Sequence, residues 1–424
     1  MANQHAFGKR DFFSIFLRRL VYLIFRVIKK LFTTQSEYGP IVFYKATSQQ
    51  EYSDLIKKIS WFLPDEKVLA NAVLVSSDNF EYIEKSNYLS DKYRASGFSV
   101  RLEHSVNDNM LFSSASIIVL TKFRYIFKLA ILKNIGKIEI TDPYFFSYVE
   151  SIAWQNLCHN SMNKESKSYY KEVTKRNFSV LQQRIMGREN AVCFVTGPSF
   201  DAYKDYNFET YDLKLICNSI VKNDDFLTYI GGPDILVFAD PVFHFGPSLY
   251  AESFRDCVFK VVRKYKCFVF VPISTLPLIL NRAEDLSQYF IGIEYRNTSF
   301  HFPTSEEIYV KDNGNILTNL LIPIASSFAN KISIFGADGR SKGEKYFWTH
   351  SKTAQFNDLM NSTFESHPSF FRDRDYSDYY EQHCKTVNDL LEFGEAQGKV
   401  YYALTRSFIP ALHSREVNTR SHNN

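Results

Sequence analysis

The chain has 424 residues, a length that is enough for two domains with separate hydrophobic cores. Hydrophobic residues make up 45% and charged residues 23%, which excludes a disordered or collagen-like chain. The net charge of +4 is too small to make nucleic acid the expected partner. The six cysteines form no CxxC pair and several lie in apolar runs, so we expect reduced core residues and neither a disulfide framework nor a zinc site.

Residues 1–36 contain a segment that mixes apolar and basic residues without a single acid. On a helix, an arc of roughly 120° holds its cations, which are Arg18, Arg19, Arg26, Lys29 and Lys30. No apolar run approaches the ~20 residues of a membrane span, and no signal-peptide cleavage site follows. We therefore predict a basic amphipathic helix on the inner leaflet of a membrane, in a cytoplasmic protein. The alternative is an amphipathic helix that docks on its own protein.

Residues 37–162 predict a first α/β domain. Apolar strand-like runs cover residues 40–44, 72–75, 116–120 and 137–140, and a helical pattern covers residues 50–62. Strands that alternate with helices indicate a parallel sheet. Pro143 ends the last strand, and Glu150 lies on the helix that follows. Glu150 is a candidate catalytic acid near this strand exit, and the alternative is a solvated surface acid.

Residues 163–188 are polar, basic and helix-prone, and we predict that they connect the first domain to a second one over residues 189–412. In the second domain, three strand-like runs end in small or polar residues. These ends are Gly197-Pro198-Ser199, Asn218-Ser219 and Asp240. Gly197 permits close approach of the backbone to a ligand, Pro198 sets the turn and Ser199 offers a hydroxyl. Because parallel strands bring their carboxyl ends to one edge, the three ends predict one convergent site.

Further polar residues compete for a role in this site. His244 is either catalytic or a core histidine, and Arg255 binds an acidic sugar or forms a surface salt bridge. His350-Ser351-Lys352 is a basic candidate for a phosphate or carboxylate. Asp373-Arg374-Asp375 matches a metal-binding DxD, but no apolar strand precedes it, so we predict no metal. Residues 413–424 are polar and predict a disordered tail.

The second domain resembles the bacterial sialyltransferases that use CMP-sialic acid on lipo-oligosaccharides. Those enzymes carry Gly-Pro-Ser after a strand, Cys-Asn at a strand end, and an amide before Pro at another. The matching positions here are Gly197-Pro198-Ser199, Cys217-Asn218 and Asp240-Pro241. The resemblance continues from Asn315 to Asp338 and ends near His383. It implies that these polar residues bind the nucleotide, that tyrosines such as Tyr376 and Tyr380 hold the phosphate, and that His383 is the base.

Asp240 departs from that pattern, because the sialyltransferases have Asn at this position. A carboxylate can attack an anomeric carbon, which an amide does poorly. The run from Asp240 to Arg255 is more similar to the retaining β-Kdo transferases of O-antigen and capsule synthesis, which use CMP-Kdo. This resemblance implies two Rossmann-like domains in a GT-B-like arrangement with the active site between them, and no metal or other cofactor. Together with the basic amphipathic helix, it predicts a peripheral protein on the inner face of the bacterial inner membrane, with a lipid-linked glycan acceptor.

The expected reaction is therefore double displacement with Asp240 as the nucleophile and Glu150 or His244 as the acid/base. One alternative is an inverting sialyltransferase in which His383 is the general base and Asp240 only orients the donor. Another alternative is a non-catalytic nucleotide-binding protein of polysaccharide assembly. Neither half shows GxGxxG after its first strand, which argues against a dehydrogenase.

Overall fold

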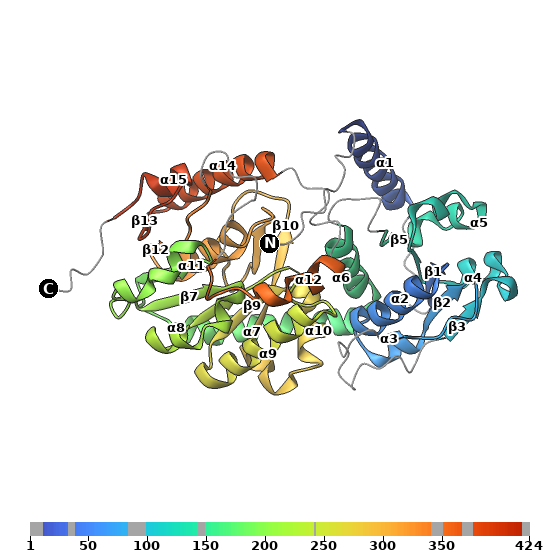
Figure 1. The fold of residues 1–424 in the computed structure, drawn as a ribbon, viewed down its shortest axis with the longest axis horizontal. Coiled ribbons are helices and arrows are strands. Elements are labelled where there is room, and N and C mark those ends of the chain that lie inside the picture. Colours follow the sequence, from blue (N-terminus) through green and yellow to red (C-terminus); the bar gives the residue numbers. More distant parts are fainter. Residues whose placement is uncertain are drawn as a thin grey trace. The chain divides into compact units, whose positions relative to one another are not determined.

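The computed structural model describes residues 12–32, 39–83, 99–142, 149–240, 243–340, 351–366 and 376–417. Packing divides the chain into two units. The first unit consists of Met1–Lys167, Pro241–Ala251 and Asn361–Arg374, and the second of Ser168–Asp240, Glu252–Met360 and Asp375–Asn424. Each unit contains one parallel sheet with helices between its strands, which confirms the predicted α/β class (Figure 1).

The sheet of the first unit has five parallel strands in the order β3-β2-β1-β4-β5. Its strands are β1 (Ile41–Ala46), β2 (Ala72–Ser76), β3 (Ser99–Leu102), β4 (Ile117–Leu120) and β5 (Ile138–Ile140). Four of them coincide with the predicted apolar runs. The edge strand β3 was missed because its residues are largely exposed and form no apolar run.

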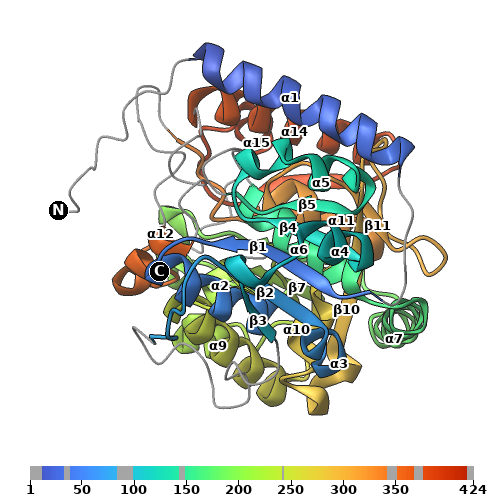
Figure 2. The same ribbon diagram turned by 90° about the vertical axis from the view of Figure 1, so that its right-hand side faces the viewer.

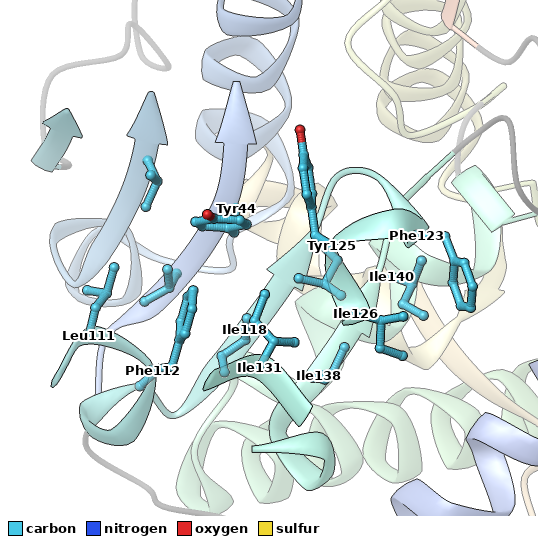
Figure 3. Close-up of a cluster of buried hydrophobic side chains, with 14 of the residues drawn as sticks. Tyr44, Leu111, Phe112, Ile118, Phe123, Tyr125, Ile126, Ile131, Ile138 and Ile140 are labelled. Atoms are coloured by element: carbon cyan, nitrogen blue, oxygen red, sulfur yellow. The ribbon is translucent and has the colours of Figure 1, made fainter. Parts of the chain in front are cut away.

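Helices cover both faces of this first sheet. They are α1 (Phe12–Leu31), α2 (Gln49–Phe62), α3 (Glu66–Ala70), η2 (Glu103–Ser105), α4 (Asp108–Ser114), η3 (Phe123–Phe127), α5 (Leu129–Leu132), η4 (Ile135–Lys137) and α6 (Val149–Ser161). On one face, Trp154 of α6 stacks on Phe43 and Phe62 with ring centroids 6.2 and 5.2 Å apart. On the other face, Tyr44 packs with Phe112, Tyr125 and Ile131 in one buried cluster (Figure 3).

Helix α1 docks on this second cluster through part of its surface. Phe25 is 7% exposed, Val21 and Tyr22 pack beside it, and Lys29 Nζ lies 2.5 Å from Glu139 Oε1. Burial of Phe25 contributes roughly 1.5–3 kcal/mol to this docking. No helix in the described ranges is long and apolar enough to cross a membrane. Docking on its own protein was the alternative expectation for this helix, and it accounts for one of its faces.

The sheet of the second unit has eight parallel strands in the order β11-β10-β9-β8-β7-β6-β12-β13. The strands are β6 (Asn190–Phe194), β7 (Leu213–Cys217), β8 (Ile235–Val237), β9 (Phe268–Pro272), β10 (Phe290–Arg296), β11 (Tyr309–Lys311), β12 (Lys331–Phe335) and β13 (Val400–Ala403). Side chains alternate between the faces, so Phe194 packs with Phe226 on one face while Cys193 Sγ approaches the Leu321 carbonyl on the other.

The helical segments of the second half of the chain lie mainly in the second unit and cover both faces of its sheet, although residues 361–366 belong to the first unit. They are α7 (Lys164–Arg184), η5 (Pro198–Asp205), η6 (Asn218–Lys222), α8 (Asp224–Tyr229), α9 (Leu249–Tyr265), η7 (Ile273–Thr275), α10 (Leu276–Leu280), η8 (Glu284–Tyr289), the π-helix η9 (Leu317–Leu321), α11 (Ile322–Phe328), η10 (Asn357–Leu359), α12 (Met360–Ser366), α14 (Tyr376–Glu395) and α15 (Pro410–His413).

Helix α7 occupies most of the expected connector, residues 163–188. Phe178 is buried against Phe270 and Phe328, and Asn177 Nδ2 donates to the Phe290 carbonyl at 2.8 Å. Gly292 N donates to Thr174 Oγ1 at 2.9 Å. The polar residues of this segment therefore belong to the outer face of a helix that packs on the second sheet.

Candidate functional site

The second sheet has a switch point between β6 and β12. From β6 the chain adds strands outward to β11 and then returns to place β12 on the other side of β6. Ligands of open parallel sheets bind outside the carboxyl ends of the strands at such a point. Gly197 follows β6 and Asp338 follows β12, so both lie at this position. The predicted turn therefore stands where the topology favours a ligand.

The Gly197-Pro198-Ser199 turn is bound tightly to the loop after β12. Ser199 donates to Asp338 Oδ2 through its backbone N–H at 3.1 Å and its hydroxyl at 2.8 Å. A Cβ at Gly197 would lie 2.2 Å from Asp338 Oδ2 and 2.4 Å from the Gly336 carbonyl oxygen, so only glycine fits. Burial raises the pKa of Asp338, although the bonds from Ser199 oppose the shift. The Ser199 hydroxyl, expected to face a ligand, thus holds the Asp338 carboxylate.

Asn218 stands at the end of β7 in a left-handed backbone conformation, with a φ of +49°. Asn tolerates this region better than most residues. Its Oδ1 atom is buried and has no hydrogen-bond partner among the residues that the structure describes. Such an acceptor costs about 1–3 kcal/mol unless a donor reaches it. The neighbouring Ser219 is 1% exposed. Asn218 therefore presents an acceptor that a ligand donor would satisfy.

Asp240 lies three residues beyond the end of β8 and is partly buried. Two residues that the sequence analysis did not single out, Tyr295 and Asp312, belong to the same edge of the sheet. Tyr295, on β10, has a buried hydroxyl without a hydrogen-bond partner within the described ranges. Burial raises the pKa of Tyr295 well above its usual value, and the carboxylates of Asp312 and Asp240 raise it further. The polar ends of the runs FIGIEYR and YVKD are the signal that could have found them.

The first turns of α14 join the loops that follow β11 and β12. Tyr379 OH donates to the Gly314 carbonyl at 2.6 Å, and Arg340 N donates to Tyr380 OH at 3.1 Å. The Arg340 guanidinium also lies over the Tyr380 ring, 4.8 Å from its centroid. Next to Gly314, Asn315 is 6% exposed, and its Oδ1 accepts from Leu317 N at 2.9 Å. The structure thus brings Tyr380 of α14 to Arg340, two residues after Asp338, and Tyr379 to Gly314, next to Asn315.

His383 lies one turn farther along α14 and is 4% exposed. Burial lowers its pKa to about 4, so the imidazole is neutral at neutral pH. Tyr376 begins the same helix, but its side chain lies outside the described residues. Burial raises the pKa of Tyr380 to about 12, which keeps its hydroxyl protonated.

A loop at residues 351–356 covers the end of β6, and Asp201 holds it there. Asp201 accepts from the Ser351 hydroxyl at 2.6 Å and the Thr353 hydroxyl at 2.7 Å, while Ser351 N donates to the Thr196 carbonyl at 2.8 Å. Burial alone would raise the pKa of Asp201, but the bonds from Ser351 and Thr353 bring it below its usual value. Lys352 is exposed beside this anchor. Sequence reasoning singled out Ser351 and Lys352 but missed Asp201.

Several candidates fall elsewhere. His244 is buried in the segment that belongs to the first unit, where the Trp61 indole N–H donates to the Phe245 carbonyl. Glu150 lies on α6 of the first unit, and its side chain is outside the described residues. Arg255 is buried on α9 in the second unit. His350 and the Asp373-Arg374-Asp375 motif lie outside the described ranges, within which no group of three or more His, Cys, Asp or Glu side chains is placed to hold a metal ion.

A cavity of about 370 Å³ is lined by residues of β6, β12 and β13 in the second sheet. Its lining includes Asn190 and Lys331, which begin β6 and β12. The candidate residues Gly197, Asn218, Asp240 and Asp338 do not line it.

Comparisons with known proteins add little to this geometry. No family model matches the sequence, and no curated protein does. Among solved structures, the chain is similar to HepE of Anabaena in complex with UDP and glucose, with a TM-score of 0.19 and 10% identity over 86% of this chain and 100% of HepE. A likeness this weak determines neither fold nor activity. The sheets themselves define an α/β protein with a polar switch point in its second unit.

Proposed function

We propose that the chain is a glycosyltransferase whose nucleotide-linked donor binds at the carboxyl edge of the second sheet. The observation that carries this proposal is the buried, unsatisfied Asn218 Oδ1 beside the switch point, since a nucleotide supplies donors there. Asp240 follows β8, which is two strands from β6. At a spacing of about 4.8 Å per strand, the ends of β6 and β8 are roughly 10 Å apart. A nucleotide lying along the edge would place its sugar toward Asp240.

The donor that we infer is CMP-Kdo, and this choice rests on the carboxylate of Asp240. One oxygen of Asp240 attacks the anomeric carbon, and the bond from that carbon to the phosphate oxygen breaks, so that CMP leaves with its electron pair. The acceptor hydroxyl then loses its proton to a base and displaces Asp240 from the same carbon. Two inversions give net retention. Glu150 and His244 remain our candidates for the acid/base role.

An inverting CMP-sialic acid transferase would need His383 as its base. His383 is 4% exposed and its pKa is lowered to about 4 by burial. A base with such a pKa is weak at neutral pH, which weighs against this alternative. The same burial suits a neutral imidazole that supports the start of α14 near the nucleotide.

Donor turnover tests the reaction. We expect the purified chain to consume CMP-Kdo faster than CMP-sialic acid or UDP-glucose, with CMP released. Asp240→Asn should lower the rate by several orders of magnitude while CMP still binds. Asp285→Asn is the matched control, because Asp285 is an exposed acid of the same unit that pairs with Arg263. Mass spectrometry of a slow reaction should find Kdo attached to the peptide that contains Asp240.

Three outcomes would contradict parts of this proposal. Full activity of Asp240→Asn removes Asp240 from the mechanism. An inverted product without an adduct favours the sialyltransferase-like alternative. Stabilisation by CMP without turnover of any sugar donor indicates a non-catalytic nucleotide-binding protein.

We also propose that α1 attaches the protein to an anionic membrane surface, where a lipid-linked glycan acceptor resides. The support is the face of α1 that is not docked, on which Leu23, Ile24, Val27 and Leu31 are 51–76% exposed. Residues 12–32 contain five cations and no acid. Because Phe25 packs in the core of the first unit, surface substitutions test this attachment more cleanly than deletion of the helix.

A further inference from the structure

A second apolar and basic surface lies on the first unit, at η3 and α5. Phe127, Leu129 and Leu132 are 73%, 69% and 42% exposed. Residues 121–138 around them contain five cations and no acid, the same charge pattern as residues 12–32. Large exposed apolar side chains that gather in one place mark an interaction surface.

This second surface and α1 are both anchored in the same hydrophobic cluster of the first unit. Ile126 and Ile131 of the η3–α5 segment are buried in the cluster that covers one face of the first sheet (Figure 3). Phe25 of α1 is buried in the same cluster. Helix α1 contacts η4, the segment that directly follows α5. Figure 2 shows α1 running past α5 and β5. The exposed side chains of both segments therefore project from the same layer of the first unit.

The charges on this layer divide into two groups. Lys29, Lys122 and Lys128 form ion pairs with Glu139, Glu51 and Asp108 of their own unit. Arg26, Lys30, Arg124 and Lys133 are exposed, and they give the layer a positive character. Because neither segment contains an acid, the layer complements an anionic partner. A second copy that docked through the same layer would place like charges opposite one another.

We propose that the exposed residues of α1 and of the η3–α5 segment together form one docking surface for an anionic lipid bilayer. The apolar side chains enter the acyl boundary, while Arg26, Lys30, Arg124 and Lys133 reach the headgroups. Two contacts from one layer hold the first unit in a defined orientation, which a single helix does not. This inference deepens the proposed attachment through α1 and rests on it.

Co-sedimentation of the full chain with vesicles tests the docking surface, using phosphatidylcholine alone and phosphatidylcholine mixed with phosphatidylglycerol. The native chain should bind the mixed vesicles only. The double variant Phe127→Ser with Leu129→Ser should bind them about tenfold more weakly, because two exposed apolar side chains no longer enter the bilayer. The matched control is Val180→Ser with Met186→Ser, which removes two side chains that are 48% and 77% exposed on the second unit.

A third variant, Leu23→Ser with Val27→Ser, separates this inference from the attachment on which it rests. If it alone loses binding, α1 attaches the protein and the η3–α5 surface does not. If neither variant loses binding, both proposals are wrong. Equal binding to neutral vesicles removes the role of charge. A native dimer that dissociates in the Phe127→Ser, Leu129→Ser variant, measured by sedimentation velocity, assigns the surface to a second copy and overturns the inference. Circular dichroism confirms folding of each variant.

Discussion

The two sheets of this protein are built alike, yet their switch points differ. In the first sheet the switch point lies between β1 and β4, and the side chains there satisfy one another. Lys122 Nζ lies 2.5 Å from Glu51 Oε1 and 2.9 Å from Thr47 Oγ1, which itself donates to Glu51 Oε2 at 2.6 Å. At the second switch point Ser199 and Asp338 also bond to each other, but on the neighbouring strand end, after β7, Asn218 Oδ1 is buried without a partner among the described residues. Each sheet thus has a switch point where a ligand could bind, and the unsatisfied Asn218 acceptor next to the second one distinguishes the two.

The pKa values of the carboxyl groups at the two switch points are shifted in opposite directions. Burial would raise the pKa of Glu51, but the bonds from Lys122 and Thr47 bring it below its usual value. Burial raises the pKa of Asp338, because the bonds from Ser199 only partly oppose it. The first switch point therefore resembles a structural ion pair, whereas at the second the effect of burial on Asp338 outweighs the hydrogen bonds from Ser199.

The largest effect that we expect in this comparison comes from Gly197→Ala. The added Cβ would meet the Gly336 carbonyl oxygen at 2.4 Å, so the turn and the loop after β12 must separate. CMP affinity should fall about a hundredfold, since a misplaced site loses several contacts at once. Gly39→Ala is the control, because its Cβ would meet the Ser114 carbonyl oxygen at 2.3 Å in the first unit. It should lower stability and leave CMP binding intact; calorimetric titration that finds both variants alike would break the comparison.

Acid should destabilise the second unit before the first. The folded pKa of His383, about 4, is lower than its ordinary value of 6.5, because burial disfavours the charged form. Its stabilising contribution is therefore present above pH 6.5 and is lost as the pH falls to about 4, by roughly 3 kcal/mol. The contribution of Glu51, with a lowered pKa, is present above its unfolded value of 4.5 and is lost below that.

Hydrogen exchange at several pH values measures these two losses separately for each unit. His383→Gln should remove most of the slope between pH 6.5 and pH 4 in the second unit. An unchanged slope in this variant would show that another group titrates there.

A smaller effect is expected from Asn218→Gly. Glycine keeps the left-handed backbone, so the fold should be preserved while the buried acceptor is removed. CMP affinity should fall about tenfold and the melting temperature should change little, because the free protein loses an unsatisfied group. Thr47→Val in the first switch point should lower the melting temperature and leave CMP affinity unchanged, since it breaks a satisfied hydrogen-bond network. Unchanged CMP binding in Asn218→Gly would remove the main support for the nucleotide site.

Tyr295→Phe should have the smallest effect. The buried hydroxyl has no partner within the described ranges, so its loss should not lower stability. As a positioning residue near Asp240, Tyr295 should affect turnover by a few-fold at most and leave the dissociation constant of CMP unchanged. Steady-state kinetics measures the effect on turnover, and titration with CMP measures the effect on its dissociation constant. A loss of CMP affinity instead would place Tyr295 in the nucleotide site.

Much of the fold was predictable because strand formation depends on local patterns. Strand β7 ends at Cys217, directly before Asn218, and Gly197 follows β6, so both residues come after strands as expected. The exposed edge strand β3 carries no apolar run, and the polar residues of α7 hide the stripe around Phe178 that packs on the second sheet. Apolar runs therefore identify buried strands reliably, but they do not reveal strands whose side chains are exposed.

The composition of the site depended on strand order, which no local pattern contains. Ser199 and Asp338 are 139 residues apart and meet only because β12 returns to the side of β6. Asp201 and Ser351, which are hydrogen-bonded, are 150 residues apart in sequence. The charge of Asp240, after β8, raises the pKa of Tyr295 on β10, although β9 lies between these strands. His244 is four residues from Asp240 in sequence, yet the two belong to different units. Sequence by itself determined which residues end the strands, whereas tertiary structure decided which of them meet, because contacts at a sheet edge follow spatial and not sequential neighbours.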